Sequence, residues 1–136
     1  MELLLGIDAG TTSIKAGIFD PGGRCLGIGR QEYQLETPAA DRAQLDPEVY
    51  WQACQKTVRE ALTLSGVQPG QVLALAVSSQ GETTITLDAN GKAIYPALVW
   101  LDNRATEQAA FLAERFGGEV YERTGIPEFS YQQVAA

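Results

Sequence analysis

The sequence contains no histidine and only two cysteines, Cys25 and Cys54, among its 136 residues. These cysteines lack the spacing of a metal site, so we expect no zinc. The apolar run at residues 3–5 is far shorter than a signal-peptide core or a membrane span, which argues against a membrane partner. Reduced thiols suit a reducing compartment, and we therefore expect a cytoplasmic protein.

Basic side chains are also scarce, because ten lysines and arginines stand against seventeen acidic residues, for a net charge of −7. A negative protein repels polyanions at long range, so nucleic acid is not an expected partner. The charge does not exclude a phosphate ligand, which backbone amides at a turn bind locally. The hydrophobic fraction of 45% is ordinary for a globular protein, and the length suits one domain over residues 1–136.

Short apolar or alternating runs predict the strands of a mixed α/β fold. Residues 3–7, 14–19 and 24–35 have this pattern, and the turn residues between them predict a three-stranded antiparallel meander. A further apolar run at residues 72–77 predicts a fourth strand in the same sheet.

Two helices are predicted from capping residues and from apolar positions at spacings of three and four. Asp46 is a good N-cap before Pro47, and Gly66 is a suitable stop for the helix that begins there. A second helix is predicted over residues 103–116, ended by the glycine pair at 117–118.

Between the fourth strand and the second helix, the sequence predicts a β-hairpin. Its strands would be residues 84–87 and 93–101, joined by a turn at residues 88–91 that contains an Asn-Gly pair.

The C-terminal residues have the pattern of a helix start. Ser130 and Gln133 resemble a capping box, and a helix of so few residues is marginal alone. We therefore expect the natural protein to continue past Ala136, and the alternative is a frayed natural tail.

The segment DAGTTSIK, residues 8–15, is the strongest candidate for a binding site. Small residues at the predicted turn let the backbone bend tightly and direct N–H groups and hydroxyls toward an anion. Asp8 suits Mg²⁺ bound through water, and Lys15 suits a phosphate group. The alternative is a plain hairpin turn. The candidate phosphate and Mg²⁺ set is Asp8, Gly10, Thr11, Thr12, Ser13 and Lys15.

Four motifs together resemble one protein family. GIDAGTTSIKAGIFD at residues 6–20 resembles the phosphate-binding opening of the actin, Hsp70 and hexokinase superfamily. SSQGETT at 78–84, NGKAIYPALVWLDNRA at 90–105 and RTGIPEFS at 123–130 follow in order. The set is similar to the FGGY family of carbohydrate kinases, which includes glycerol kinase, xylulokinase and ribulokinase.

The resemblance implies a ribonuclease H-like domain whose mixed sheet opens with the antiparallel meander and is flanked by helices. It implies ATP and Mg²⁺ as cofactors and a small-molecule sugar or polyol as partner. The family's catalytic base is an aspartate in a later segment, so this chain would hold no catalytic residue and would be inactive alone. The rest of this domain and a second domain would follow Ala136, and the surface meant for them predicts self-association of the fragment.

The same resemblance implies a set of substrate-binding residues in the later motifs, which are Gln80, Glu82, Trp100, Asp102 and Arg104. Glycerol kinases have an arginine where this sequence has Gly81, which argues against glycerol as substrate. The structural alternatives are an exposed strand-end carboxylate for Glu82, a core position for Trp100 and a helix N-cap for Asp102.

Two other functions remain as alternatives to a kinase. One is a non-catalytic phosphate- or sugar-binding or regulatory module on the same fold. The other is an ATPase of the Hsp70 or actin type that acts through conformational change. The W-x-D-x-R string at residues 100–104 and the QGETT string at 80–84 argue against the ATPase, because both are sugar-side features of FGGY enzymes.

Overall fold

The computed structural model describes residues 2–125 and divides them into two compact units. The first unit comprises residues up to 34 together with residues 47–80, and the second comprises residues 35–46 and those from 81 onward. Each unit is described by itself.

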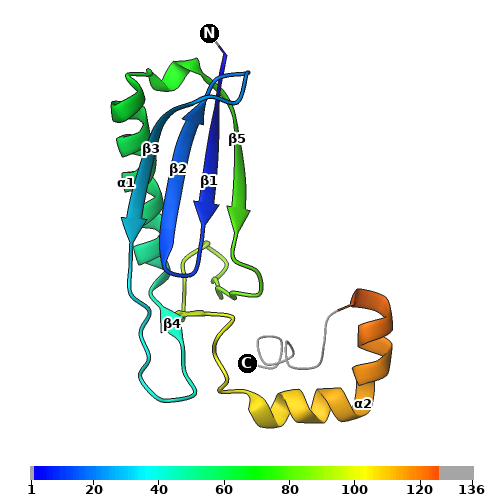
Figure 1. The fold of residues 1–136 in the computed structure, drawn as a ribbon. Helices are drawn as coiled ribbons and strands as arrows, with labels where there is room; N and C mark the ends of the chain where they lie inside the picture. Colours follow the sequence, from blue (N-terminus) through cyan, green and yellow to red (C-terminus); the bar gives the residue numbers. More distant parts are fainter. Residues whose placement is uncertain (1, 126–136) are drawn as a thin grey trace. The chain divides into compact units, whose positions relative to one another are not determined.

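A four-stranded mixed sheet forms the first unit (Figure 1). Strands β1 (Leu3–Ala9), β2 (Ser13–Phe19) and β3 (Cys25–Glu32) form an antiparallel meander, and β5 (Val72–Ser79) lies parallel to β1. The strand order is β3-β2-β1-β5. The predicted meander and the predicted fourth strand are both confirmed.

Helix α1 (Pro47–Ser65) packs on one face of this sheet (Figure 1). Alternate side chains of the strands point toward it, because successive residues of a strand face opposite sides. The buried core cluster consists of Leu3, Leu5, Ala16, Ile18 and Ala61.

Two glycines of β3 allow α1 to approach closely. A methyl group at Gly27 would lie 2.6 Å from the carbonyl oxygen of Ala61, and one at Gly29 would overlap the carbonyl oxygen of Thr57. The helix therefore packs directly on the β3 backbone.

The predicted limits of α1 are confirmed. The helix begins at Pro47, and Gly66 follows its last residue with φ 68°. The Gly66 amide donates to the carbonyl of Thr63 at 3.2 Å. A 3₁₀ turn, η1 (Pro69–Gln71), then leads into β5.

The second unit contains much shorter strands. Strand β4 (Gln44–Leu45) pairs antiparallel with β6 (Ala97–Leu98). The turn at residues 88–91 is present, with Gly91 at φ 79° and an Asp88 amide that donates to the Lys92 carbonyl at 2.8 Å.

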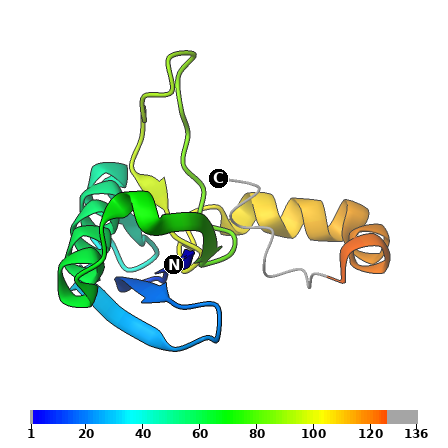
Figure 2. The ribbon, with the colours of Figure 1, turned by 90° about the horizontal axis from the view of Figure 1, so that it is seen from above.

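The predicted hairpin around this turn is only partly correct. The segments on its two sides run side by side (Figure 2), but they are joined by two isolated bridges, Leu87 to Ala93 and Thr84 to Leu98, rather than by continuously paired strands. Residues 84–87 are exposed or nearly so on both faces, and without a buried face nothing fixes a continuous register. The regular strand here, β6, also pairs with β4, for which the sequence predicted no strand.

Helix α2 (Thr106–Thr124) differs from its prediction at both ends. Its N-cap is Ala105, not Asp102, and the helix continues through the glycine pair to Gly125, which has φ 70° and donates to the carbonyl of Tyr121 at 2.8 Å. A helix-interior glycine costs only about 1 kcal/mol, so the pair weakens the helix without ending it. The stop is the left-handed conformation of Gly125.

Between residues 2 and 125, no helix combines the length and hydropathy needed to cross a bilayer. The predicted capping box at Ser130 and Gln133 lies outside the described residues.

Candidate functional site

The predicted phosphate-binding residues form the hairpin between β1 and β2. Asp8 pairs with Lys15 and Ala9 with Ile14 across the two strands, and the Gly10 amide donates to the Ser13 carbonyl at 3.0 Å. A methyl group at Gly10 would lie 3.1 Å from that same oxygen, so the tight turn favours glycine. The structure thus brings the six predicted residues together in one hairpin, with Gly10, Thr11 and Thr12 in its turn.

Asp8 and Lys15 are the charged residues of this hairpin. Their Oδ2 and Nζ atoms are 3.8 Å apart, and their side chains are 56% and 44% exposed. An exposed ion pair contributes little stability. Asp8 and Lys15 can therefore each give up this contact and bind a ligand instead.

An open depression of about 430 Å³ lies beside this pair. It is on the sheet face opposite α1, because Asp8 and Lys15 alternate with the core residues of β1 and β2. Besides Asp8 and Lys15, its lining is mostly apolar and consists of Gly6, Ile7, Gly17, Phe19, Ile28, Ala76, Val77 and Ser78.

The donor set of the hairpin fits Mg²⁺ bound together with a nucleotide. Asp8 offers an exposed carboxylate, and no group of three or more acidic, histidine or cysteine side chains within residues 2–125 forms a metal cage. Mg²⁺ commonly takes one or two carboxylates, substrate phosphates and water, so a single aspartate is adequate.

Gln80, at the end of β5, lies close to this hairpin in the same unit. Its amide donates to the carbonyl of Ala9 at 2.9 Å, and its side-chain Nε2 donates to the hydroxyl of Tyr50 at 3.3 Å. The Gln80 Oε1 atom is buried and accepts no hydrogen bond from the described residues. A buried acceptor without a donor is costly, which makes this oxygen a candidate for a ligand hydroxyl.

Two tyrosines of this region were not identified from the sequence. Tyr33 donates its hydroxyl to the carbonyl of Gly10, and its ring meets that of Tyr50 edge to face, with centroids 5.1 Å apart. The one sequence feature that could have identified Tyr33 is its position. It directly follows β3, the strand that pairs with the hairpin strand β2.

Glu82, in the second unit, has an uncommon backbone conformation. Its φ is 62°, in the left-handed region that a non-glycine residue seldom adopts, and the residue is exposed. The Thr83 amide donates to the Gly81 carbonyl at 2.8 Å across this tight bend. Strained backbone of this kind is concentrated at functional sites.

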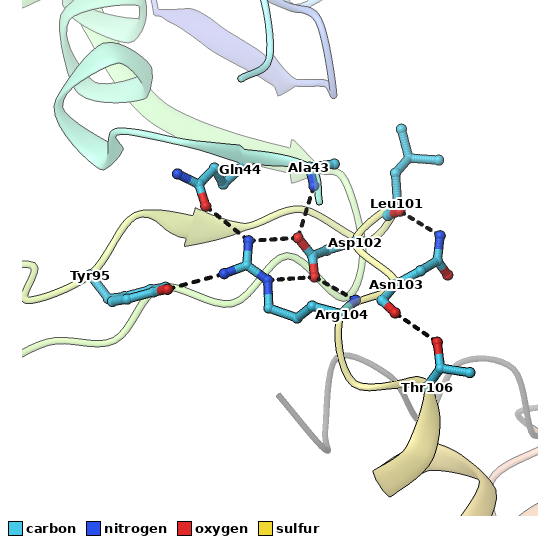
Figure 3. A network of polar contacts seen from close by, with 8 residues as sticks. All are labelled: Ala43, Gln44, Tyr95, Leu101, Asp102, Asn103, Arg104 and Thr106. Atoms are coloured by element: carbon cyan, nitrogen blue, oxygen red, sulfur yellow. Dashed lines mark hydrogen bonds and ion pairs between the residues drawn. The ribbon is translucent and has the colours of Figure 1, made fainter. Parts of the chain in front are cut away.

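Asp102 and Arg104 form the centre of a polar network in the second unit (Figure 3). Asp102 is 3% exposed, and its Oδ2 accepts from the Ala43 amide at 2.8 Å. Arg104 donates through Nε to Asp102 Oδ1 and through Nη2 to Oδ2, each at 2.8 Å. The same guanidinium reaches Gln44 Oε1 at 2.8 Å and the Tyr95 hydroxyl at 3.1 Å.

These contacts determine the charge state of the pair. Burial alone would raise the pKa of Asp102, but hydrogen bonds from Arg104 and from the Ala43 amide outweigh it and hold the pKa below the usual 3.8. Hydrogen bonding to Asp102 in turn raises the pKa of Arg104. Both groups are therefore charged at neutral pH, and both carboxylate oxygens are already engaged.

Two structural interpretations of this segment are wrong. Trp100 is 45% exposed and is not a core residue, and Asp102 is buried but does not cap α2. Asp102 instead links two segments that are 59 residues apart in the sequence.

A meander joined through a crossover helix to a strand parallel to β1, with a Gly-Thr-Thr-Ser turn after β1, defines a ribonuclease H-like opening of the actin and hexokinase type. The chain belongs to the FGGY family of carbohydrate kinases, because the family's N-terminal domain matches residues 3–135.

Individual relatives agree with this assignment. The chain is 32% identical over 130 residues to a glycerol kinase of Thermococcus kodakarensis, which covers 96% of this chain and 26% of that protein. Two solved structures from Lactobacillus acidophilus, a gluconate kinase and a ligand-bound xylulose kinase, are each 26% identical with a TM-score of 0.82. They cover 93% and 94% of this chain and 25% and 26% of their own chains. The chain thus spans about a quarter of the length of these relatives.

Proposed function

We propose that the protein carrying this chain transfers the γ-phosphate of ATP to a hydroxyl of a ketose or polyol. The observation that supports this most is the β1–β2 hairpin, which places an exposed carboxylate and an exposed amine on either side of a turn rich in hydroxyls, in a chain of the FGGY family. The chain supplies phosphate and substrate contacts, and the base is expected in a later segment.

Each residue of the hairpin has a distinct part in this proposal. The backbone amides and the hydroxyls of Thr11, Thr12 and Ser13 bind phosphate oxygens, and Lys15 neutralises their charge. Asp8 holds Mg²⁺ through water, and this ion, when bound, offsets the negative charge of the phosphates.

The substrate contacts are proposed from the motif positions, residue by residue. Gln80 offers a buried acceptor without a donor among the described residues, and Glu82 offers an exposed carboxylate; both suit sugar hydroxyls. Trp100 is 45% exposed, and its indole suits contact with a sugar ring. Asp102 and Arg104 have their polar atoms engaged with protein groups, so contact with substrate requires that one of these bonds be exchanged.

The names of the relatives support a polyhydroxy acceptor. They are named as kinases of glycerol, gluconate and xylulose, all of which carry several hydroxyls. By the resemblance of the motif at residues 78–84, Gly81 takes the place of an arginine of glycerol kinases, and we therefore propose a ketose rather than glycerol.

The test is ATP consumption by the protein at its natural length, with and without a panel of pentuloses, hexuloses and polyols. Consumption that depends on one such acceptor is expected, and Lys15→Ala should lower kcat/KM at least tenfold by removing a charge that neutralises phosphate. Lys56→Ala, an exposed lysine of α1, is the matched control. Consumption without acceptor would favour the ATPase, and no consumption at all would favour the binding module. The 136-residue chain alone should show no turnover.

A further inference from the structure

One residue, Tyr33, forms hydrogen bonds to both sides of the turn between β1 and β2. Tyr33 lies just after β3, and its amide donates to the carbonyl of Thr12 at 3.0 Å while its hydroxyl donates to the carbonyl of Gly10. Thr12 and Gly10 flank the middle of the turn, so the two bonds fix the peptide planes whose N–H groups and neighbouring hydroxyls are proposed to meet phosphate.

A second tyrosine holds the neighbouring strand end. The Tyr50 ring packs edge to face against Tyr33, at an interplanar angle of 86°, and its hydroxyl accepts from Gln80 Nε2 at 3.3 Å. Gln80 is also bound through its amide to Ala9, directly before the turn. The two rings thus support two different proposed ligand contacts, the hairpin through Tyr33 and Gln80 through Tyr50.

The state of the Tyr33 hydroxyl suits this role. Burial, with the nearby Tyr50 and the negative charge of Asp8, raises the pKa of Tyr33 to about 12. The hydroxyl is therefore protonated at every physiological pH and remains a donor to Gly10. A carbonyl held by such a donor cannot rotate toward an incoming phosphate, which it would repel.

We propose that Tyr33 is a positioning residue for nucleotide phosphate, which it serves by locking the Gly10 and Thr12 carbonyls away from the ligand, and that Tyr50 positions Gln80 for the acceptor substrate. The identity of the two ligands rests on the proposed function. The hydrogen bond from the Tyr33 hydroxyl to the Gly10 carbonyl, here called the hydroxyl clamp, can be tested without turnover. It adds two residues to the site, neither of which lies in the motifs that identified it.

The experiment compares Tyr33→Phe with Tyr50→Phe, each of which removes one oxygen atom and keeps its ring. In the protein at its natural length, Tyr33→Phe should raise KM for ATP about three- to tenfold, the effect of one lost hydrogen bond, with KM for the acceptor changed less than twofold. Tyr50→Phe should show the reverse pattern. Matching melting temperatures check that both variants fold.

Hydrogen exchange on the 136-residue chain gives a readout that needs no substrate. The amides of Gly10 and Tyr33 should exchange faster in Tyr33→Phe and at the wild-type rate in Tyr50→Phe. Unchanged exchange in Tyr33→Phe, or equal changes of both KM values in the two variants, would overturn the proposal. If no acceptor supports ATP consumption, the proposed function fails, while faster exchange confined to Tyr33→Phe would still support the clamp.

Discussion

The four strands of the first unit are seven or eight residues long, whereas β4 and β6 of the second unit have two residues each. The first unit is held by continuous backbone ladders and by an apolar core between the sheet and α1. In the second unit, a buried carboxylate and its arginine join segments that the short strands alone connect weakly.

The two units should differ in which substitutions they tolerate. Stabilisation by apolar burial is spread over many atom contacts, so most of it remains when one contact is lost. Stabilisation by an ionic network depends on each of its members. We therefore expect charge substitutions to affect the second unit and volume substitutions to affect the first.

The largest effect is expected for Asp102→Asn. The change leaves Arg104, whose side chain is 14% exposed, without its charge partner, and breaking such a buried pair costs about 3 kcal/mol. Denaturant unfolding gives the loss, and hydrogen exchange should place it in the second unit, at the Ala43 amide first. Asp88→Asn is the control, since Asp88 also accepts two backbone amides but lies in an open turn, where asparagine makes the same bonds. Equal losses in both variants would contradict this account.

Acid should act on the same network. Because the folded pKa of Asp102 is lowered, its contribution to stability is present above the unfolded pKa, about 4, and is lost as the pH falls through the folded value. Protection of the second unit is expected to decrease below about pH 4. In Asp102→Asn this part of the pH dependence should be absent, and a melting-temperature profile that keeps it would assign the effect to another carboxylate.

In the first unit, Gly29→Ala should be strongly destabilising. Its methyl group would overlap the Thr57 carbonyl oxygen of α1, and overpacking of this kind costs about 2 kcal/mol. Gly70→Ala, where a methyl group meets no described atom within 4 Å, should have little effect on denaturant unfolding. If the two variants unfold alike, α1 does not depend on the glycines of β3.

Sequence patterns predicted the first unit well because its signals are local. Alternating residues mark β2, and the pair Asp46–Pro47 with Gly66 marks the limits of α1 within a few positions. The second unit was predicted less well because β4 lies in a polar segment and pairs with the distant strand β6, and because Asp102 accepts from the amide of Ala43, 59 residues away. No local pattern encodes that contact.

In the candidate site too, residues with a local sequence signal were predicted, and residues that depend on distant contacts were not. The spacing of Asp8, Gly10 and Lys15 indicated a phosphate turn, and the structure places these residues at one hairpin. Tyr33 was missed because its partner is a backbone carbonyl 23 residues away, which has no side-chain signature. The later motifs predict Asp102 and Arg104 as substrate contacts, whereas their partners in the structure are protein groups, and their contact with substrate stays a prediction.

Glu82 offers a test of whether strain in the second unit serves function. Glycine adopts φ 62° without penalty, so Glu82→Gly should stabilise the chain by about 1 kcal/mol while it raises KM for the acceptor in the protein at its natural length. Glu82→Ala removes the carboxylate and keeps the strain, and is expected to raise KM without the gain in melting temperature. A stabilised Glu82→Gly variant with unchanged KM would remove Glu82 from the proposed site.

The smallest effect is expected for Gly118→Ala, in the interior of α2. No described atom lies within 4 Å of the added methyl group, and alanine favours a helix over glycine by up to about 1 kcal/mol. Hydrogen exchange along α2 should slow, whereas Gly125→Ala, at the left-handed C-cap, should speed it. α2 bends along its length (Figure 1), and glycine pairs are among the few features that let a helix bend. Faster exchange in Gly118→Ala would therefore show that the second unit requires this bend more than it requires helix propensity.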